Sequence, residues 1–375
     1  MTPIGHGVVP LTPAELASAR QYLYGAIGWG VLAQIWMLGV LAAIYYSGVS
    51  SAWERALRRR WRGKWIVSAG LAALLAACVL LTLFPFDFYL GFLRERAFGF
   101  ERLAAMAWLA EWAESSLLTV AVTVVVAAIA YAWALRRPRW WLRLWLVLSV
   151  GVIFAVTVQP VLIAPLFNRF TPVRDPARRA EIEGLARTAG IPRARILQMD
   201  ASRQSAHTNA YVVGILGSQR IVVFDTLLET EPPAEVQFVV AHEIGHYVLH
   251  HLWKGVAFTL AFLLLLCALL AWLFPRLARG HAPGDIAALP LLLLILLALL
   301  FLAAPVTNGF SRWEEHQADA YGLALSHRAC AAVASFAREE RTDLIYPDPP
   351  GWMVWWFFNH PSQQQRIDFA QRSCR

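Results

Sequence analysis

The chain has 375 residues, of which 58% are hydrophobic and 15% charged, and its mean hydropathy is +0.49. Soluble domains carry about 25% charged residues, so this composition excludes an ordinary water-soluble protein. The net charge of +8 comes largely from basic residues in short loops beside apolar segments. That distribution is typical of membrane topology. We therefore expect an integral membrane protein whose partner is the lipid bilayer, with no nucleic-acid partner.

Six apolar segments are long enough to cross a bilayer core of roughly 30 Å at about 1.5 Å per helical residue. None contains Asp, Glu, Lys or Arg, as expected where an unpaired charge is costly. The first segment lacks the basic flank and cleavage site of a signal peptide, so we expect it to be retained. The predicted spans are 21–46, 65–86, 117–135, 144–167, 255–274 and 286–306.

The spans divide the chain into alternating membrane and polar parts. We predict an N-terminal membrane region of four spans (1–167), a catalytic segment (168–254), a two-span hairpin (255–306) and a second catalytic segment (307–375). The first catalytic segment has a helical pattern over 176–189 and a helix after Pro232-Pro233 that runs into the fifth span. Its β-branched runs predict strands over 196–199, 210–215 and 221–224, the last two joined by a turn at Leu216-Gly217-Ser218.

The run His242-Glu243-Ile244-Gly245-His246 is an H-E-x-x-H pattern. On a helix, two imidazoles at i and i+4 share one face and can bind the same zinc ion, with the intervening Glu beside it. Zinc lowers the pKa of a coordinated water to about 7, and Glu243 is then the general base that removes the proton. Chance produces this pattern in roughly 1% of chains of this length. We predict one zinc ion per chain.

Catalytic zinc usually has a third protein ligand, for which Glu315 is the best candidate. His246 lies nine residues before the fifth span and Glu315 nine residues after the sixth. Each is therefore roughly 14 Å along its helix from the same membrane face. Glu314 and His316 are rival ligands, but they point away from the face that Glu315 shares with Asp319. Asp319 is predicted to accept a hydrogen bond from a ligating imidazole, the alternative being a solvated helix residue.

Other candidate residues carry weaker signals. His360, in Asn359-His360-Pro361, and Arg366 are suited to stabilising an oxyanion, although a lone loop histidine is more often structural. His250 and His251 are more consistent with interface residues than with ligands. The remaining candidates are predicted to bind substrate. Asn209, Ala210 and Tyr211 follow His207 on an expected strand edge, and Asn308 follows the sixth span.

Several of these runs resemble the type I CAAX prenyl endoproteases, which are membrane zinc metalloproteases that cut prenylated proteins in eukaryotes. The resemblance implies that Glu315 is the third ligand, that Asp319 orients a ligand, that Asn209 and Ala210 form a substrate edge, and that His360 and Arg366 stabilise the transition state. It also implies a water-filled chamber within the membrane. The similarity extends over 84–367, and its most specific runs are 165–168, 205–211, 220–226, 242–246, 311–319 and 360–361.

We therefore predict a mainly α-helical polytopic membrane protein of about six spans with a small α+β gluzincin-type zinc protease domain. The predicted activity is that of a metalloendopeptidase acting on a peptide or protein substrate presented at the membrane, lipidated or not. One alternative is a general membrane quality-control metalloprotease. A remote alternative is a non-catalytic scaffold with structural zinc, which would need a closed four-ligand site.

The number of spans and the distribution of basic loops distinguish this chain from the eukaryotic members. Those members are longer at the N-terminus and have seven spans, so we expect this chain to lack the first of them. The basic loops over 55–64, 136–139 and 276–279 lie on the face opposite the zinc, which by the positive-inside rule predicts an extracytoplasmic active site in a bacterial inner membrane. Cys330 and Cys374 would pair only in an oxidising compartment.

Overall fold

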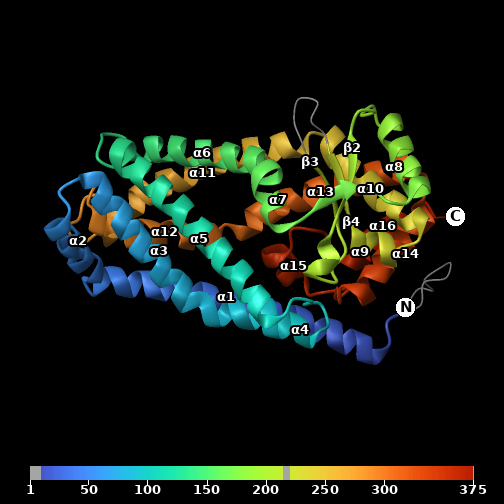
Figure 1. Cartoon of the computed structure of the whole chain (residues 1–375), viewed down its shortest axis with the longest axis horizontal. Helices are drawn as coiled ribbons and strands as arrows, with labels where there is room; N and C mark the ends of the chain where they lie inside the picture. Colours follow the sequence, from blue (N-terminus) through green and yellow to red (C-terminus); the bar gives the residue numbers. More distant parts are fainter. Residues whose placement is uncertain (1–9, 214–219, 375) are drawn as a thin grey trace.

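The computed structural model describes residues 10–213 and 220–374. The expected turn at Leu216-Gly217-Ser218 and the end of the expected strand 210–215 lie outside these residues. Figure 1 shows an elongated helical bundle with a small sheet and several helices at one end. The start of the first helix and the C-terminus both lie at the sheet end of the molecule.

Within the described residues up to six segments are suited to spanning a membrane, in agreement with the predicted number. Five are long and apolar enough to cross a membrane alone, and the sixth is a helix pair bent by 49°. Three of the spans end in a π-helical segment followed by other short helical or turn residues. The spans are built from α1 (Pro13–Tyr46), α3 (Lys64–Phe88) with η1 (Tyr89–Arg94) and α4 (Glu95–Ala97), α5 (Ala105–Ile129) with η2 (Ala130–Ala134), α6 (Trp140–Val158) with η3 (Gln159–Ile163) and α7 (Ala164–Phe167), α11 (His251–Leu277), and α12 (Leu289–Leu302) with α13 (Ala304–Ser326).

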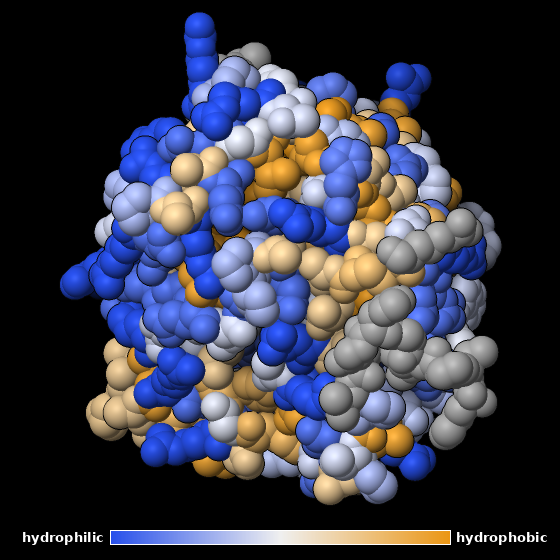
Figure 2. Space-filling view, turned by 90° about the vertical axis from the view of Figure 1, so that its right-hand side faces the viewer, coloured by the Kyte–Doolittle hydropathy of each residue, from blue (hydrophilic) through white to orange (hydrophobic). Residues whose placement is uncertain are grey.

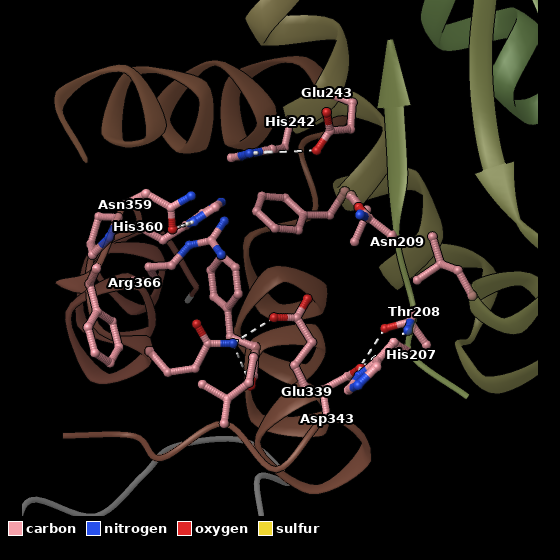
Figure 3. A pocket seen from close by; sticks show the side chains of 18 residues that line it. His207, Thr208, Asn209, His242, Glu243, Glu339, Asp343, Asn359, His360 and Arg366 are labelled. Carbon is pink, nitrogen blue, oxygen red and sulfur yellow. Dashed lines mark hydrogen bonds and ion pairs between the residues drawn. The ribbon is translucent and has the colours of Figure 1, made fainter. Parts of the chain in front are cut away.

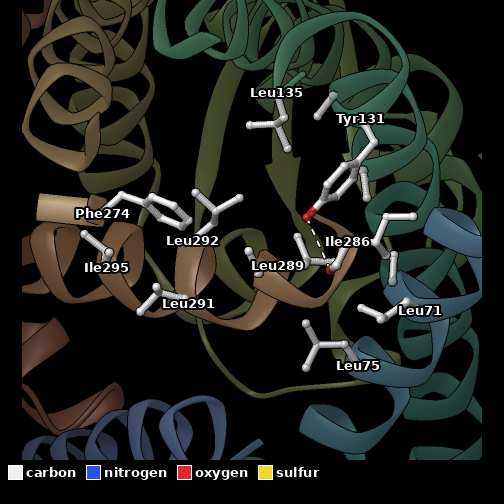
Figure 4. Close-up of a cluster of buried hydrophobic side chains, with 14 of the residues drawn as sticks. Leu71, Leu75, Tyr131, Leu135, Phe274, Ile286, Leu289, Leu291, Leu292 and Ile295 are labelled. Atoms are coloured by element: carbon white, nitrogen blue, oxygen red, sulfur yellow. Dashed lines mark hydrogen bonds between the residues drawn. The ribbon is translucent and has the colours of Figure 1, made fainter. Parts of the chain in front are cut away.

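The end of the bundle opposite the sheet is closed by an apolar cluster. Side chains of α3, α5, α11 and α12 pack there around Tyr131, whose hydroxyl donates to the carbonyls of Asp285 and Ile286 (Figure 4). The connecting turns meet outside this cluster. The backbone N–H of Ala287, within η5 (Ile286–Ala288), donates to the carboxylate of Glu54 in α2 (Val49–Arg60) at 3.1 Å. The basic turns therefore gather at one end of the molecule.

The polar part contains a four-stranded sheet in the order β1-β2-β4-β3. β2 and β4 are parallel, and the two outer pairs are antiparallel. β1 was not predicted from the sequence. Among the described residues β3 pairs with β4 alone, so it is an edge strand of the sheet. The strands are β1 (Phe170–Pro172), β2 (Arg195–Met199), β3 (Ala210–Val213) and β4 (Arg220–Phe224).

Local sequence signals explain where the surrounding helices begin. Asp175 caps α8 through the N–H of Ala177 and Pro176 follows it, while Pro233 occupies the first turn of α10. Ser362 and Gln365 form a capping box at the start of α16. These elements are α8 (Pro176–Thr188), η4 (Ala201–Arg203), α9 (Asp225–Thr230), α10 (Pro233–Val248), α14 (Ala329–Thr342), α15 (Gly351–Phe357) and α16 (Gln363–Gln371).

Two helices are broken where the sequence predicts continuity. The expected helix from Pro233 into the fifth span is wrong, because α10 ends at Val248 and His250 adopts a left-handed conformation, with φ of 58°, before α11. The sixth span bends at Ala303, between α12 and α13. Figure 2 shows the sheet end of the molecule, where hydrophilic residues cover much of the surface between hydrophobic patches. This end is therefore suited to projecting from the membrane.

Candidate metal centre and active site

The H-E-x-x-H residues lie on the inner face of α10, which packs between the sheet and α13. His242 is buried, His246 is half-buried, and their Nε2 atoms are 3.1 Å apart. Glu243 lies beside them, with Oε1 3.9 Å from Nε2 of His242. The two imidazoles therefore direct one nitrogen each to a single point, with a carboxylate next to it.

Close packing of two helices brings Glu315 to the same point. Oε2 of Glu315 is 3.3 Å from Nε2 of His242, and Oε1 is 3.4 Å from Nε2 of His246. Gly322 makes this approach possible, because a Cβ there would lie 3.0 Å from the backbone of His242. A carboxylate on α13 thus completes a set of three donor atoms that all lie within 4.8 Å of one another.

The spacing of these donors fits a tetrahedral cation. Ligand atoms bound at about 2.0–2.1 Å in tetrahedral geometry lie roughly 3.3 Å apart, close to the 3.1–3.4 Å separations of this site. Two imidazoles and one carboxylate also match the chemistry of catalytic zinc sites. The rival residues do not join this group. The ring of His316 packs against Phe369 at a centroid distance of 4.5 Å, and Glu314 lies outside the three-donor set.

Asp319 and Arg366 hold His242 from behind. Oδ1 of Asp319 is 2.9 Å from Nδ1 of His242, so the ring directs Nε2 to the donor set. Arg366 donates to both oxygens of Asp319, at 3.0 and 2.7 Å. Burial opposes the charge on Arg366, but the carboxylate of Asp319 raises the pKa of its guanidinium. Its planar fork is therefore engaged by Asp319, and any contact with substrate would use its remaining edge.

His251 supports the second imidazole and was not recognised as doing so from the sequence. Its Nδ1 lies 2.9 Å from Nδ1 of His246, and its Nε2 lies 3.4 Å from Oε1 of Gln317. A proton shared between the two Nδ1 atoms leaves Nε2 of His246 free as a donor atom. The left-handed residue His250 creates this contact by turning the chain back, a break that the sequence pattern did not indicate.

The electrostatics of the site depend on burial and on the neighbouring carboxylates. Burial would lower the pKa of His242, but contacts with Asp319 and Glu315 raise it to about 10. Burial raises the pKa of the Glu243 carboxyl, and burial lowers the pKa of His360. The carboxylates of Asp319 and Glu315 therefore make this a position that favours positive charge, which a divalent cation would supply in place of a proton on Nε2 of His242.

A cavity of about 480 Å³ opens beside these residues. Figure 3 shows His242 and Glu243 at one end of it, His360 and Arg366 along one wall, and Asn209 on the opposite wall. Nε2 of His360 lies 3.3 Å from Oε2 of Glu315. Glu339 also lines the cavity and was missed, because nothing in the sequence around α14 distinguishes it from a solvated helix residue.

The predicted substrate-binding residues are not equally placed. Asn209 lines the cavity. Ala210 is buried at the start of β3, and the ring of Tyr211 packs edge-on against Phe224. Asn308 lies elsewhere, since its Nδ2 donates to the carbonyl of Trp356 at 2.5 Å and it is absent from the residues lining the cavity.

Two imidazoles one helical turn apart, a carboxylate from a second helix and a Glu beside them define a metal-dependent peptidase on a membrane scaffold. The sequence profile described as peptidase family M48 matches residues 172–373, and one described as CAAX prenyl protease N-terminal, five membrane helices, matches 9–169. Within the described part of that second range, the structure has four spanning segments. The chain belongs to peptidase family M48 and is a multi-pass membrane metalloprotease.

Known relatives agree along most of the chain. An uncharacterized metalloprotease, YhfN, of Bacillus subtilis is 30% identical, and the matched region spans 96% of this chain and 87% of the YhfN chain. A CAAX prenyl protease 1 homolog of Dictyostelium discoideum is 28% identical over 90% of this chain and 83% of its own. The crystal structure of S. mikatae Ste24p superposes with a TM-score of 0.83, at 25% identity, over 97% of this chain and 92% of the other. The resemblance to CAAX prenyl proteases is confirmed.

Proposed function

We propose that this metalloprotease is a zinc-dependent endopeptidase in which His242, His246 and Glu315 hold the metal and Glu243 is the general base. The observation that carries the proposal is the set of 3.1–3.4 Å separations among donors from two helices, with Glu243 beside them. These three donors leave a fourth tetrahedral position open, as in catalytic zinc sites.

The chain's own residues divide the work of peptide hydrolysis. Zinc, when bound, supplies a Lewis acid that makes water acidic near neutral pH. Glu243 accepts the proton of the attacking water and passes it to the leaving amine nitrogen. Asp319 and Arg366 keep the ring of His242 oriented, and His360, at the cavity wall, stabilises the negative oxygen that develops on the scissile carbonyl.

We propose that segments 168–254 and 307–375 form one catalytic domain, joined through the hairpin 255–306 and following the membrane region 1–167. Contacts between α10 and α13 at the donor set support this division. The substrate is a peptide held near the membrane, as the names of the CAAX prenyl protease relatives suggest. It would extend along the outer edge of β3 past Asn209.

We also propose that the active site faces the extracytoplasmic side of a bacterial inner membrane. Basic residues are concentrated in the turns at the end of the bundle opposite the sheet, which the positive-inside rule assigns to the cytoplasm. Cys330 and Cys374 form a disulfide on the catalytic side, and such bonds persist in oxidising compartments.

Purified wild type and a Glu243→Gln variant test the metal and the base together. Zinc content is measured in both, and cleavage is measured on a prenylated CAAX peptide and on unmodified casein. We expect zinc in both proteins and cleavage at least about 100-fold slower in the variant. Glu229→Gln, at an exposed position of α9, is the matched control and should cleave normally. Equal cleavage by the Glu243→Gln variant would show that Glu243 is not the base.

A further inference from the structure

A second cluster of charged side chains lies outside the metal centre, around His207. Its Nδ1 is 2.8 Å from Oδ1 of Asp343, and its Nε2 is 3.2 Å from Oε2 of Glu95. Tyr22 donates to both oxygens of Glu95 at 2.9 and 3.0 Å, and Arg94 pairs with Glu95 at 3.0 Å. These five residues are called the His207 junction below.

The surroundings of His207 favour its charged form. It lies between two carboxylates, and its ring stacks on Phe100 with centroids 4.0 Å apart. Burial would lower the pKa of His207, but hydrogen bonds to Asp343 and Glu95 raise it to about 9. At neutral pH a single imidazolium therefore joins two carboxylates, the arrangement in which a charge-assisted hydrogen bond is strongest.

The junction connects parts of the chain that are distant in sequence. Tyr22 lies near the start of α1, Glu95 at the end of the second span, and Asp343 directly after α14. Backbone bonds strengthen the same seam, since Ala206 donates to the carbonyl of Phe100 at 3.0 Å and Arg102 to that of Gln204 at 3.1 Å. The membrane helices are thus fastened to the loop that precedes β3.

The same loop forms part of the cavity wall. His207, Thr208, Asn209 and Asp343 all line the cavity that contains His242 and Glu243. Thr208 donates to Asp343 through its backbone N–H at 3.2 Å and its hydroxyl at 3.1 Å. Figure 3 shows His207 and Asp343 at the end of the cavity away from His242 and Glu243. A movement of the junction would therefore displace the wall that carries Asn209.

We propose that His207 is a positioning residue that anchors the cavity wall 207–209 to the membrane helices and thereby sets the affinity for the peptide substrate. The proposal rests on the proposed function, because it takes Asn209 and the edge of β3 as the place where substrate binds. His207 itself is separate from the chemistry, since its ring nitrogens are engaged by Glu95 and Asp343.

The test compares kinetics of wild type and His207→Gln on the same peptide. We expect KM to rise about tenfold while kcat changes by less than about twofold, because only substrate positioning is lost. His327→Gln, at an exposed position about three turns of helix beyond Glu315, is the matched control and should leave both constants unchanged. An unchanged KM in His207→Gln overturns the proposal, as does a parallel loss of zinc and kcat.

A double variant and the pH dependence of KM distinguish a positioning role of His207 from a general effect on stability. The double variant Glu95→Gln/His207→Gln should raise KM by clearly less than the product of the two single effects, because both changes remove the contact between His207 and Glu95. Four groups face the imidazole or its partners. The carboxylates of Glu95 and Asp343 stabilise its positive charge, the hydroxyl of Tyr22 lies 3.4 Å from its Nε2, and Arg94 pairs with Glu95. Wild-type KM should therefore rise as pH increases through about 9, and this rise should be absent in His207→Gln. Additive effects of the two substitutions would contradict the proposal.

Hydrogen exchange provides a measurement that is independent of activity. The amide of Thr208 donates to Asp343, so it should exchange at least about tenfold faster in His207→Gln than in wild type. If wild type does not cleave peptides but this difference appears, the proposed function fails and the junction stands. If wild type cleaves and the exchange is unchanged, the junction fails alone. Should His207→Gln not fold, Glu95→Gln carries the same comparison.

Discussion

The carboxyl of Glu231 is buried where the catalytic helices meet, away from the metal centre. It is 2% exposed, and Oε2 accepts a hydrogen bond from Ser335 at 3.2 Å. Burial and the nearby carboxyls of Glu339 and Glu235 raise its pKa to about 8. A group whose pKa is 4.5 unfolded and about 8 folded binds more protons in the folded state, so the stability it contributes is complete below pH 4.5 and is lost as pH rises towards 8.

Glu231→Gln should therefore stabilise the protein in a pH-dependent way. We expect its thermal midpoint in detergent to match wild type near pH 4.5 and to exceed it by about 2–5 °C at pH 8 and above. Glu229→Gln, exposed two residues earlier, is the matched control and should show no such divergence. A constant difference between Glu231→Gln and wild type across pH would refute a protonated Glu231 in the folded state.

We expect Asp319 to influence metal affinity through the orientation of His242. Replacing it with Asn removes the charge that the Nδ1–H of His242 and the guanidinium of Arg366 both contact. We expect Asp319→Asn to lower zinc affinity about 10–100-fold in competition with a chelator, the usual loss for a partner of a metal-binding imidazole. Asp368→Asn, at an exposed position of α16, is the control. Wild-type affinity in Asp319→Asn would show that the carboxylate does not hold the ligand.

Individual site residues were predictable to different degrees for physical reasons. His242, Glu243 and His246 lie within one helical turn, so their spacing alone brings them together. Glu315 required an argument about depth in the membrane, because 69 residues separate it from His246. The junction partners of His207 were invisible, since contacts such as His207 with Glu95 join distant elements and leave no local pattern.

At the scale of elements, the positions of the predicted spans agree with the structure. Two helices expected to be continuous are instead broken, one between α10 and α11 and one between α12 and α13. Apolar composition and length identify a spanning helix reliably. Neither reports a single left-handed residue such as His250, nor the 49° bend at Ala303. The sixth span bends where α13 begins, and Glu315 lies on α13 beyond that bend. Helix direction here depends on tertiary contacts, which hydropathy does not contain.

Close contact between α10 and α13 depends on Gly322. An alanine Cβ at this position would lie 3.0 Å from both N and Cα of His242, and neither backbone atom can move freely. Gly322→Ala should therefore separate the helices and reduce zinc affinity about tenfold or more, despite the better helix propensity of alanine. Gly309→Ala in the same helix is the control, since its Cβ would meet only a side-chain atom of Arg312 at 3.7 Å. Equal zinc affinities in the two variants would contradict this account.

At the scale of the whole molecule, one face collects both catalytic segments and the opposite face collects the basic turns. The N-terminal end of α1 is tied to the catalytic side by the ion pair between Glu15 and Arg341, at 3.3 Å. The spans then return the chain to the same side after α4, after α6 and after α12. Composition and charge predicted this alternation, because a bilayer allows few arrangements of six apolar helices.

Orientation in the membrane gives the last prediction. Cys330 and Cys374 are joined across a separation of 44 residues, for which a chain-entropy estimate gives about 4 kcal/mol of stabilisation in an oxidising compartment. If the basic turns face the cytoplasm, alkaline phosphatase fused to the C-terminus should be active. Green fluorescent protein fused at the same position should not fluoresce. When intact cells are alkylated before lysis, Cys330 and Cys374 should then remain unmodified, because their sulfurs are joined in the disulfide. A fluorescent C-terminal fusion with both thiols free would instead place the metal centre in the cytoplasm, and the disulfide would not contribute to stability there.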